Sequence, residues 1–470
     1  MGFTFPSNGF APVSLTVPLV MFAWIPIVLY LFSRYPARRA VIISFLAAWL
    51  FLPEAELELP GIPDITKASI TCYGVLLATF IFDVKRFSSF RFSWLDLPMT
   101  IWCLCPFVSS LTNDLGPYDG FSAALEQTMT WGVPYFLGRI YIGSLEGMRQ
   151  LAVGIFIGGL VYVPLCLYEI RFSPQLHRMV YGGHAAANFS MTMRLGGYRP
   201  TVFMQTGLAV AAFMFVATLI GIWLWQSGTL KQLWGIPIEL LVGALALTFI
   251  LCRSSGALIL MIFGLGIMLI AKYFRTALPV FLLIGLIVVY LYVNAETESY
   301  VTDQIIEYLS NVFPPERIQS LEFRFNNEEL LTDRARERIW FGWGGYGRAL
   351  VRLNEYGGIT VQDSLWIIAF GHHGTVGLVS LFTAMLLPVV ALFRLRYPAP
   401  LWFRPKIAPT AVVGVGITLY MVDCILNAMI NPIYIVAVGG ISAMVLRPRE
   451  TRQMARKRPT AASRRYLPQA

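Results

Sequence analysis

Residues 365–393 read LWIIAFGHHGTVGLVSLFTAMLLPVVALF and contain no aspartate, glutamate, lysine or arginine. A stretch of this length and character can cross roughly 30 Å of bilayer hydrocarbon as a helix. The rest of the chain is similar, because 57% of its 470 residues are hydrophobic and only 13% are charged. Soluble domains carry about a quarter charged residues. The sequence therefore predicts an all-α, polytopic membrane protein.

Comparable apolar stretches recur along the chain, and we expect a bundle of about 12 to 13 transmembrane helices. The predicted spans lie near residues 12–32, 40–52, 66–83, 95–112, 121–142, 150–168, 201–225, 237–252, 256–271, 278–293, 365–393, 407–426 and 432–446. We expect one membrane domain over residues 1–446, followed by a basic, disordered cytoplasmic tail over residues 447–470. The first span is expected to remain as an anchor, since no basic region precedes it.

Basic residues cluster in alternate loops, which the positive-inside rule assigns to the cytoplasm. These clusters lie at residues 34–39, 85–91, 149, 231, 272–275 and 394–406, and from residue 447 onward. The net charge of +10 is thus explained by orientation and by attraction to lipid headgroups. Nucleic acid is not an expected partner.

The one long connection, residues 293–363, belongs to the other set of loops and is expected outside. Between residues 293 and 361 it contains seven arginines and no lysine. Arginine's planar fork of donors suits bidentate binding of phosphate or carboxylate. Periodicity predicts short helices at 300–312 and 326–339, followed by a glycine-rich aromatic turn at 341–348. The loop predicts an anionic ligand at the outer face.

Two further arginines lie near predicted span ends on the same side. Arg199 precedes Pro200, and proline favours the first position of a helix, so we expect Arg199 at a helix N-terminus, where anions bind. Arg253 lies in a very short connection between two spans and could reach the same anion. Both arginines could instead bind lipid headgroups.

Ionisable residues next to or inside the spans are the remaining candidates. Asp363 precedes a long helix, where it could act as a general base or as an N-cap; the two roles are compatible. Arg324 stands among several carboxylates, so it either binds the anion or belongs to a solvated helix face. Arg139 lies inside a predicted span near its cytoplasmic end, and we expect it to snorkel towards the headgroups.

No metal and no other cofactor is expected. The histidines do not show the spacing of metal ligands, and the six cysteines do not suggest a disulfide framework. Carboxylates in the first outer loop could hold Mg or Mn, although a negatively charged loop is the simpler interpretation; they are Glu54, Glu56, Glu58 and Asp64.

Together these residues resemble the superfamily of bacterial O-antigen ligases and O-antigen polymerases, most clearly over residues 195–385. The segment Gly374-Thr375-Val376-Gly377-Leu378 fits the family's glycine-x-x-glycine-leucine pattern, and counting back from it places Asp363 where the family has a histidine. Further similar segments are Arg199 before a span, Arg253-Ser254-Ser255-Gly256-Ala257 and Phe341-Gly342-Trp343-Gly344. A subgroup of the family is similar at residues 168–177 and 427–432.

The resemblance implies glycan transfer from an undecaprenyl-diphosphate-linked donor to a glycan or lipid acceptor. The reaction would be inverting and metal-independent, at the periplasmic face of the bacterial inner membrane. The implied catalytic residues are Asp363, Arg199 and Arg324, with the arginines on the diphosphate. We expect the substrate-binding residues to be Arg253, Arg348, Arg171, His177 and Glu169.

Two questions stay open at this stage. The sequence does not separate a ligase from a polymerase, because acceptor choice depends on the shape of a groove. The alternative function is a transporter or flippase for an anionic lipid or solute. Transporters often contain internal repeats, and none is visible in this sequence.

Overall fold

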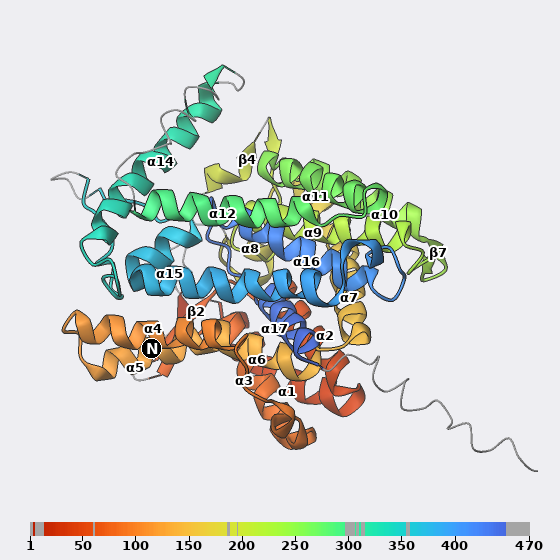
Figure 1. Ribbon diagram of the computed structural model, residues 1–470, viewed down its shortest axis with the longest axis horizontal. Coiled ribbons are helices and arrows are strands. Elements are labelled where there is room, and N and C mark those ends of the chain that lie inside the picture. Colours follow the sequence, from red (N-terminus) through yellow and green to blue (C-terminus); the bar gives the residue numbers. More distant parts are fainter. Residues whose placement is uncertain are drawn as a thin grey trace, which may run out of the picture.

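The computed structural model describes residues 3–4, 14–59, 62–185, 189–194, 196–296, 306, 310–311, 315–353 and 358–447. Six helices in these ranges are long and apolar enough to cross a membrane. They are α1 (Thr16–Arg34), α7 (Leu145–Phe172), α9 (Gly207–Gln226), α11 (Ser255–Tyr273), α12 (Leu278–Glu296) and α15 (Leu365–Ala391). The predicted α-helical fold is thereby confirmed for the described residues, and these six candidate spans support the predicted membrane protein (Figure 1).

The other predicted spans correspond to shorter or interrupted helices. Five shorter apolar helices are α3 (Lys67–Phe82), α4 (Leu97–Thr112), α10 (Ile238–Leu251), α16 (Ala408–Asp423) and α17 (Pro432–Leu446). Three more are α2 (Ala37–Phe51), α5 (Pro117–Gln127) and α6 (Val133–Tyr141). The predicted span at 121–142 is not one α-helix, because a π-helical turn, η2 (Thr128–Gly132), joins α5 to α6.

Strands and short turns connect the helices. One sheet has the order β1-β2-β3, and two hairpins pair β4 with β5 and β6 with β7. Their bounds are β1 (Phe3–Thr4), β2 (Glu56–Leu59), β3 (Ile62–Ile65), β4 (Met193–Arg194), β5 (Gly197–Tyr198), β6 (Gln232–Leu233) and β7 (Ile236–Pro237). Short helical turns are α8 (Leu176–Tyr181), η1 (Val84–Ser89), η3 (Phe189–Thr192), η4 (Leu392–Arg396) and η5 (Ala399–Leu401).

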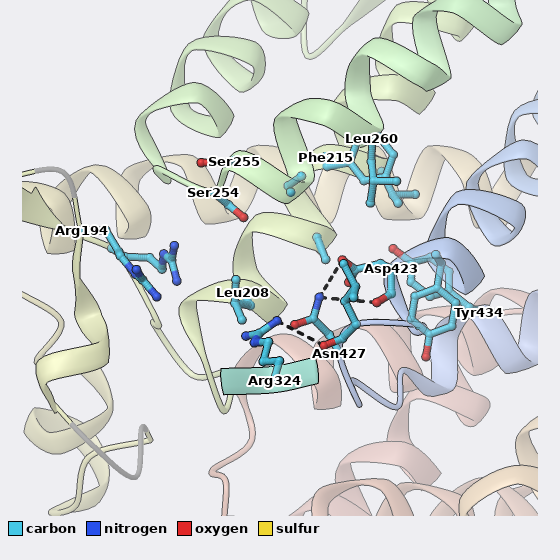
Figure 2. Close-up of a pocket in the computed structure, with 17 residues that line it drawn as sticks. Arg194, Leu208, Phe215, Ser254, Ser255, Leu260, Arg324, Asp423, Asn427 and Tyr434 are labelled. Atoms are coloured by element: carbon cyan, nitrogen blue, oxygen red, sulfur yellow. Dashed lines mark hydrogen bonds between the residues drawn. The ribbon is translucent and has the colours of Figure 1, made fainter. Parts of the chain in front are cut away.

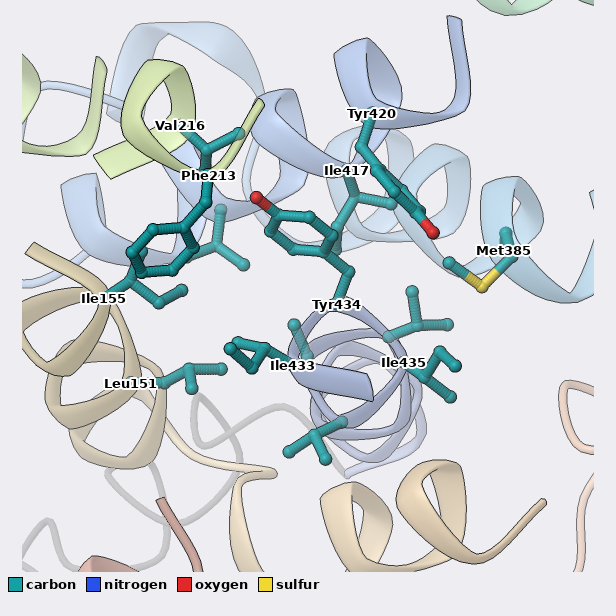
Figure 3. Packing of buried hydrophobic residues seen from close by; sticks show 14 of the residues in the cluster. Leu151, Ile155, Phe213, Val216, Met385, Ile417, Tyr420, Ile433, Tyr434 and Ile435 are labelled. Atoms are coloured by element: carbon teal, nitrogen blue, oxygen red, sulfur yellow. The ribbon is translucent and has the colours of Figure 1, made fainter. Parts of the chain in front are cut away.

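Helices α9, α16 and α17 form the centre of the bundle, and side chains from α7 and α15 pack around them (Figure 3). Helices α6 and α17 touch through their backbones. A Cβ at Gly138 would lie 2.0 Å from the Val436 carbonyl oxygen, and one at Gly439 would lie 2.0 Å from that of Tyr135. Small residues allow such close approach between membrane helices. The central helices therefore form a tightly packed support for the polar groups at their ends.

Between α12 and α15 the chain forms α14 (Pro315–Arg336), which projects from one end of the molecule (Figure 1). This helix begins earlier than the predicted helix at 326–339. The predicted helix at 300–312 lies largely outside the described residues, as does the predicted tail beyond Arg447. Whether the connection is extracytoplasmic stays a prediction.

The glycine-rich aromatic turn after α14 is confirmed, and it packs into a break in α15. Gly342 and Gly344 have positive φ values of 65° and 71°. Their loop reaches α15, where the Trp343 backbone N–H donates to the Gly371 carbonyl oxygen at 2.9 Å. At Gly374 the backbone of α15 is not helical (φ 63°, ψ −164°), and a Cβ there would lie 2.3 Å from the Trp340 carbonyl carbon. Because Gly374 has no side chain, the loop backbone at Trp340 can pack directly against the backbone of α15.

Candidate functional site

Two arginines that the sequence singles out, Arg199 and Arg324, line the same cavity (Figure 2). The cavity has a volume of about 190 Å³ and lies among α9, α11, α14, α16 and α17. Arg194 also lines it, as do Asp423 and Asn427. Three guanidinium groups and one carboxylate face a common space, so the cavity favours an anion.

The N-terminus of α11 adds backbone donors to this cavity. Ser254, Ser255, Gly256 and Ala257 all line it. Ser254 is the N-cap residue, and its side chain makes no capping hydrogen bond. The first N–H groups of a helix point outward along its axis and carry the positive end of the helix dipole. A phosphate oxygen in this cavity would meet both guanidinium groups and backbone N–H groups.

Arg199 reaches the cavity from a loop rather than from a helix end. The prediction that a helix begins at Pro200 is wrong, because α9 begins at Gly207 with Thr206 as its N-cap. The backbone N–H of Arg199 donates to the Thr192 carbonyl oxygen at 2.7 Å. The side chain is buried and lies across Gly207, where a Cβ would be 2.3 Å from the Arg199 Cδ.

Arg253 lies beside the cavity and holds the segment that contains Arg194 and Arg199. Its Nη1 donates to the Arg194 carbonyl oxygen at 3.0 Å, and its own carbonyl oxygen accepts from Arg199 Nη2 at 3.1 Å. It has a positive φ of 54°, which is uncommon for a residue other than glycine. Its guanidinium group lies over Gly197, where a Cβ would be 2.2 Å from Nη1. Arg253 therefore connects the β4–β5 hairpin, which contains Arg194 and is followed directly by Arg199, to the N-terminus of α11.

Arg324 enters the cavity from α14 and connects it to Asp363. Its Nε lies 3.7 Å from Asp363 Oδ2, and its Nη1 donates to the Leu426 carbonyl oxygen at 3.3 Å. The Asp363 side chain is 39% exposed. The prediction that Asp363 caps the following helix is wrong, because the N-cap of α15 is Ser364. Asp363 is thus a partly exposed carboxylate paired with an arginine of the cavity.

Glu328 fixes α14 against two spanning helices, and the sequence analysis missed it. The Ser364 hydroxyl donates to Glu328 Oε1, and the Tyr290 hydroxyl donates to Oε2 at 3.3 Å. Burial raises the pKa of Glu328 to about 7. One buried carboxyl group therefore joins α12, α14 and the residue next to Asp363.

Glu169 organises the loop that carries Arg199. It is fully buried, and its carboxylate accepts hydrogen bonds from three backbone N–H groups. These are Leu176 at 2.9 Å, Thr201 at 2.8 Å and Val202 at 2.7 Å. The structure therefore gives Glu169 a role in positioning this loop, while its predicted role in binding substrate stays a prediction.

The other predicted substrate-binding residues lie elsewhere. His177 is buried, its Nε2 accepts from the Glu54 backbone N–H at 3.1 Å, and burial lowers its pKa. Arg171 is exposed, with its guanidinium carbon 5.5 Å from the centre of the Phe172 ring. Arg348 Nη1 donates to the Asn113 carbonyl oxygen at 3.0 Å. None of His177, Arg171 and Arg348 is among the described residues that line the cavity.

Two other sequence expectations concern charged side chains. Arg139 does not snorkel, because its Nε lies 2.7 Å from Asp96 Oδ1 and both side chains are buried. In the first predicted outer loop, Glu54 forms an ion pair with Lys67. Among the described residues, no three histidine, cysteine, aspartate or glutamate side chains are grouped so as to hold a metal ion.

Arg194 and Asp423 were not predicted from the sequence, and Asn427 was identified only as part of the similar segment at 427–432, without a role. Asp423 is an ionisable residue at the end of an apolar helix, and such residues are functional candidates by default. That signal could have identified it. Arg194 gave no comparable signal, since it lies in a polar loop whose path depends on Glu169 and Arg253.

Comparison with known proteins does not assign this chain to a family: no family model matches the sequence, and no curated protein matches it. The chemistry of the cavity is therefore the basis for inferring a function.

Proposed function

We propose that this protein transfers a glycan from an undecaprenyl-diphosphate-linked donor to an acceptor hydroxyl, as O-antigen ligases and polymerases do. The observation that carries the proposal is the cavity in which Arg194, Arg199 and Arg324 face the N-terminus of α11. A diphosphate bears several negative charges within a short distance. Guanidinium forks and helix N–H groups are the donors that suit such a group.

In the proposed reaction the acceptor oxygen attacks the anomeric carbon of the donor. The bond from that carbon to the diphosphate oxygen breaks, and its electron pair leaves with the diphosphate. Displacement in one step inverts the anomeric centre. Arg199 and Arg324 stabilise the charge that develops on the leaving group. Asp363 accepts the proton of the acceptor hydroxyl, and its partial exposure beside Arg324 leaves room for an acceptor.

The proposal includes an arrangement in the membrane. The shorter apolar helices would cross together with the six long ones, giving about 12 to 13 spans. The end of the bundle that carries α14 and the cavity would face the periplasm of a bacterium, and the basic connections at the other end would face the cytoplasm. This orientation would bring the cavity to the lipid-linked donor at the outer surface of the inner membrane.

Complementation of a deletion strain tests the proposal. The variants Arg199→Ala, Arg324→Ala and Asp363→Ala should insert normally and fail to restore surface glycan. Charge-assisted contacts are worth about 1.5–3 kcal/mol each, so each variant should lose at least tenfold in transfer rate. Arg171→Ala and Arg348→Ala are matched controls, since they remove arginines that the structure places elsewhere, and they should complement.

The lipid-linked intermediates then identify the reaction. A carrier that accumulates with single repeats indicates a lost polymerase, and full-length carrier-linked chains without acceptor conjugate indicate a lost ligase. Full complementation by all three cavity variants would contradict the site. Uptake of labelled carrier lipid into proteoliposomes, without any transfer product, would favour transport over transfer.

A further inference from the structure

The cavity has two chemically different ends. At the end formed by α11 and the β4–β5 hairpin, the polar groups are cationic or are helix N–H donors. At the end formed by α16 and α17, the polar lining residues are Asp423, Asn427, Tyr420 and Tyr434. Arg324 lies between Arg194 and Asp423 in Figure 2 and donates to the Leu426 carbonyl oxygen at 3.3 Å, so it marks the boundary of this end. Asn427 Nδ2 donates to Asp423 Oδ1 at 2.9 Å, which orients the carboxylate. A carboxylate repels phosphate, so the part of the cavity beyond Arg324 suits a different part of a ligand.

The two tyrosines at this end differ in one respect. Their rings lie 4.6 Å apart, centre to centre. The Tyr420 hydroxyl donates to the Met429 carbonyl oxygen at 2.6 Å. The Tyr434 hydroxyl is buried and has no hydrogen-bond partner within the part of the chain that the structure describes. In Figure 3 it points from α17 towards α9, where Val216, another lining residue, lies.

A buried hydroxyl without a partner costs about 1–3 kcal/mol, so most such groups in proteins are paired. For a hydroxyl that lines a cavity, a bound ligand is one source of the missing partner. A phenol donor, a carboxylate acceptor and an amide within one small volume match a ring that carries several hydroxyl groups. Apolar neighbours such as Phe215 and Leu260 would contact the C–H groups of such a ring.

We propose that this end of the cavity binds the sugar attached directly to the diphosphate of the donor. Tyr434 donates a hydrogen bond to an oxygen substituent of that sugar, and Asp423 accepts one from a sugar hydroxyl. Tyr434 is thus a specificity-determining residue that distinguishes a glycosylated carrier from a bare one. This inference rests on the proposed function, because it takes the diphosphate to lie at the arginine end.

Binding measurements on the full-length protein in nanodiscs test the inference. The two probes are farnesyl diphosphate, which has no sugar, and carrier-linked glycan purified from a strain that lacks the protein. Tyr434→Phe removes one oxygen atom and should weaken binding of the carrier-linked glycan about fivefold. Its affinity for farnesyl diphosphate should not change. Tyr141→Phe, at a buried tyrosine of α6 that does not line the cavity, is the matched control, and it should leave the ratio of the two affinities unchanged.

Three other outcomes of these binding measurements would contradict the inference. If Tyr434→Phe leaves the affinity ratio unchanged, because it weakens both probes equally or neither, the inference is wrong. If the wild type binds farnesyl diphosphate as tightly as the carrier-linked glycan, the inference is also wrong, but the anion site stands. If the wild type binds neither probe, the proposed function fails together with the inference.

Discussion

Two glycines leave room for arginine side chains, one for Arg199 in the cavity and one for Arg253 beside it. Gly197 and Gly207 each lie under the side chain of an arginine, Arg253 and Arg199 respectively. A methyl group at either glycine would overlap that arginine. The arginine, rather than the backbone, would move, because it is the more flexible of the two. We therefore expect these glycines to affect anion binding in the cavity without contacting the anion themselves.

Gly207→Ala should displace Arg199 and weaken farnesyl diphosphate binding about tenfold, the value of one charge-assisted hydrogen bond. The helix itself should tolerate the change, since alanine is a better helix former than glycine. Gly243→Ala in α10 is the control, because a Cβ there meets nothing within 4 Å. Calorimetric titration of both variants measures the effect. Equal affinity in wild type and Gly207→Ala would contradict this account of how Arg199 is held.

At the residue scale, the sequence predicted which residues line the cavity better than it predicted the contacts that they make. Arg199 and Arg324 were singled out, and they do line one cavity. The prediction that Asp363 caps a helix and the prediction that Arg139 snorkels were wrong for the same reason. Each prediction considered a side chain with its own helix, whereas the structure pairs Asp363 with Arg324 and Arg139 with Asp96. Both partners are distant in sequence, and one sequence carries no direct signal of such pairs.

At the element scale, Glu328 of α14 contacts Tyr290 of α12 and Ser364, the N-cap residue of α15. Burial raises the pKa of this carboxyl group from 4.5 to about 7, while in the unfolded chain it returns to its ordinary value. Between these pH values the folded protein holds a proton that the unfolded protein releases. The stabilisation is therefore fully present below about pH 4.5 and is lost as the pH rises through 7.

This linkage predicts a difference between two variants. From pH 5 to pH 8 the wild type should lose roughly 2.5 kcal/mol of unfolding free energy through this group. Glu328→Gln keeps an acceptor for Ser364 but does not titrate, so its stability relative to wild type should rise over the same range. Thermal unfolding at both pH values measures the difference. Glu337→Gln, which changes an exposed carboxylate after α14, is the control, and an identical pH trend in Glu328→Gln and wild type would refute the linkage.

Hydropathy predicted the existence of the elements more reliably than their ends. The long apolar helices are present, but α9 begins at Gly207 because Thr206 accepts a hydrogen bond from the Ala209 backbone N–H. Pro200 instead lies in the loop that Glu169 organises. The break in α15 at Gly374 also follows from a tertiary contact, the entry of the loop at Trp340. Local sequence patterns do not predict where a distant segment of the chain will pack.

At the scale of the whole molecule, the residues of the candidate site lie together at one end of the helix bundle. Helix α11 runs from Ser255 at the cavity to Tyr273, and its 19 residues span about 28 Å at 1.5 Å per residue, close to the thickness of the hydrocarbon. The cavity and the connection that follows α11 should therefore lie on opposite sides of a membrane. The arginines of the cavity would then be at one surface and Lys272 and Arg275 at the other.

Labelling of single cysteines tests this arrangement. The six natural cysteines are all buried, so a membrane-impermeant maleimide should not react with them. Tyr346, in the turn after α14, and Phe274, after α11, are 77% and 76% exposed. In intact spheroplasts Tyr346→Cys should be labelled at once, and Phe274→Cys only after the membrane is permeabilised. Labelling of both variants from the same side would contradict the span assigned to α11, while the reverse pattern would place the cavity in the cytoplasm, where a periplasmic glycan donor could not reach it.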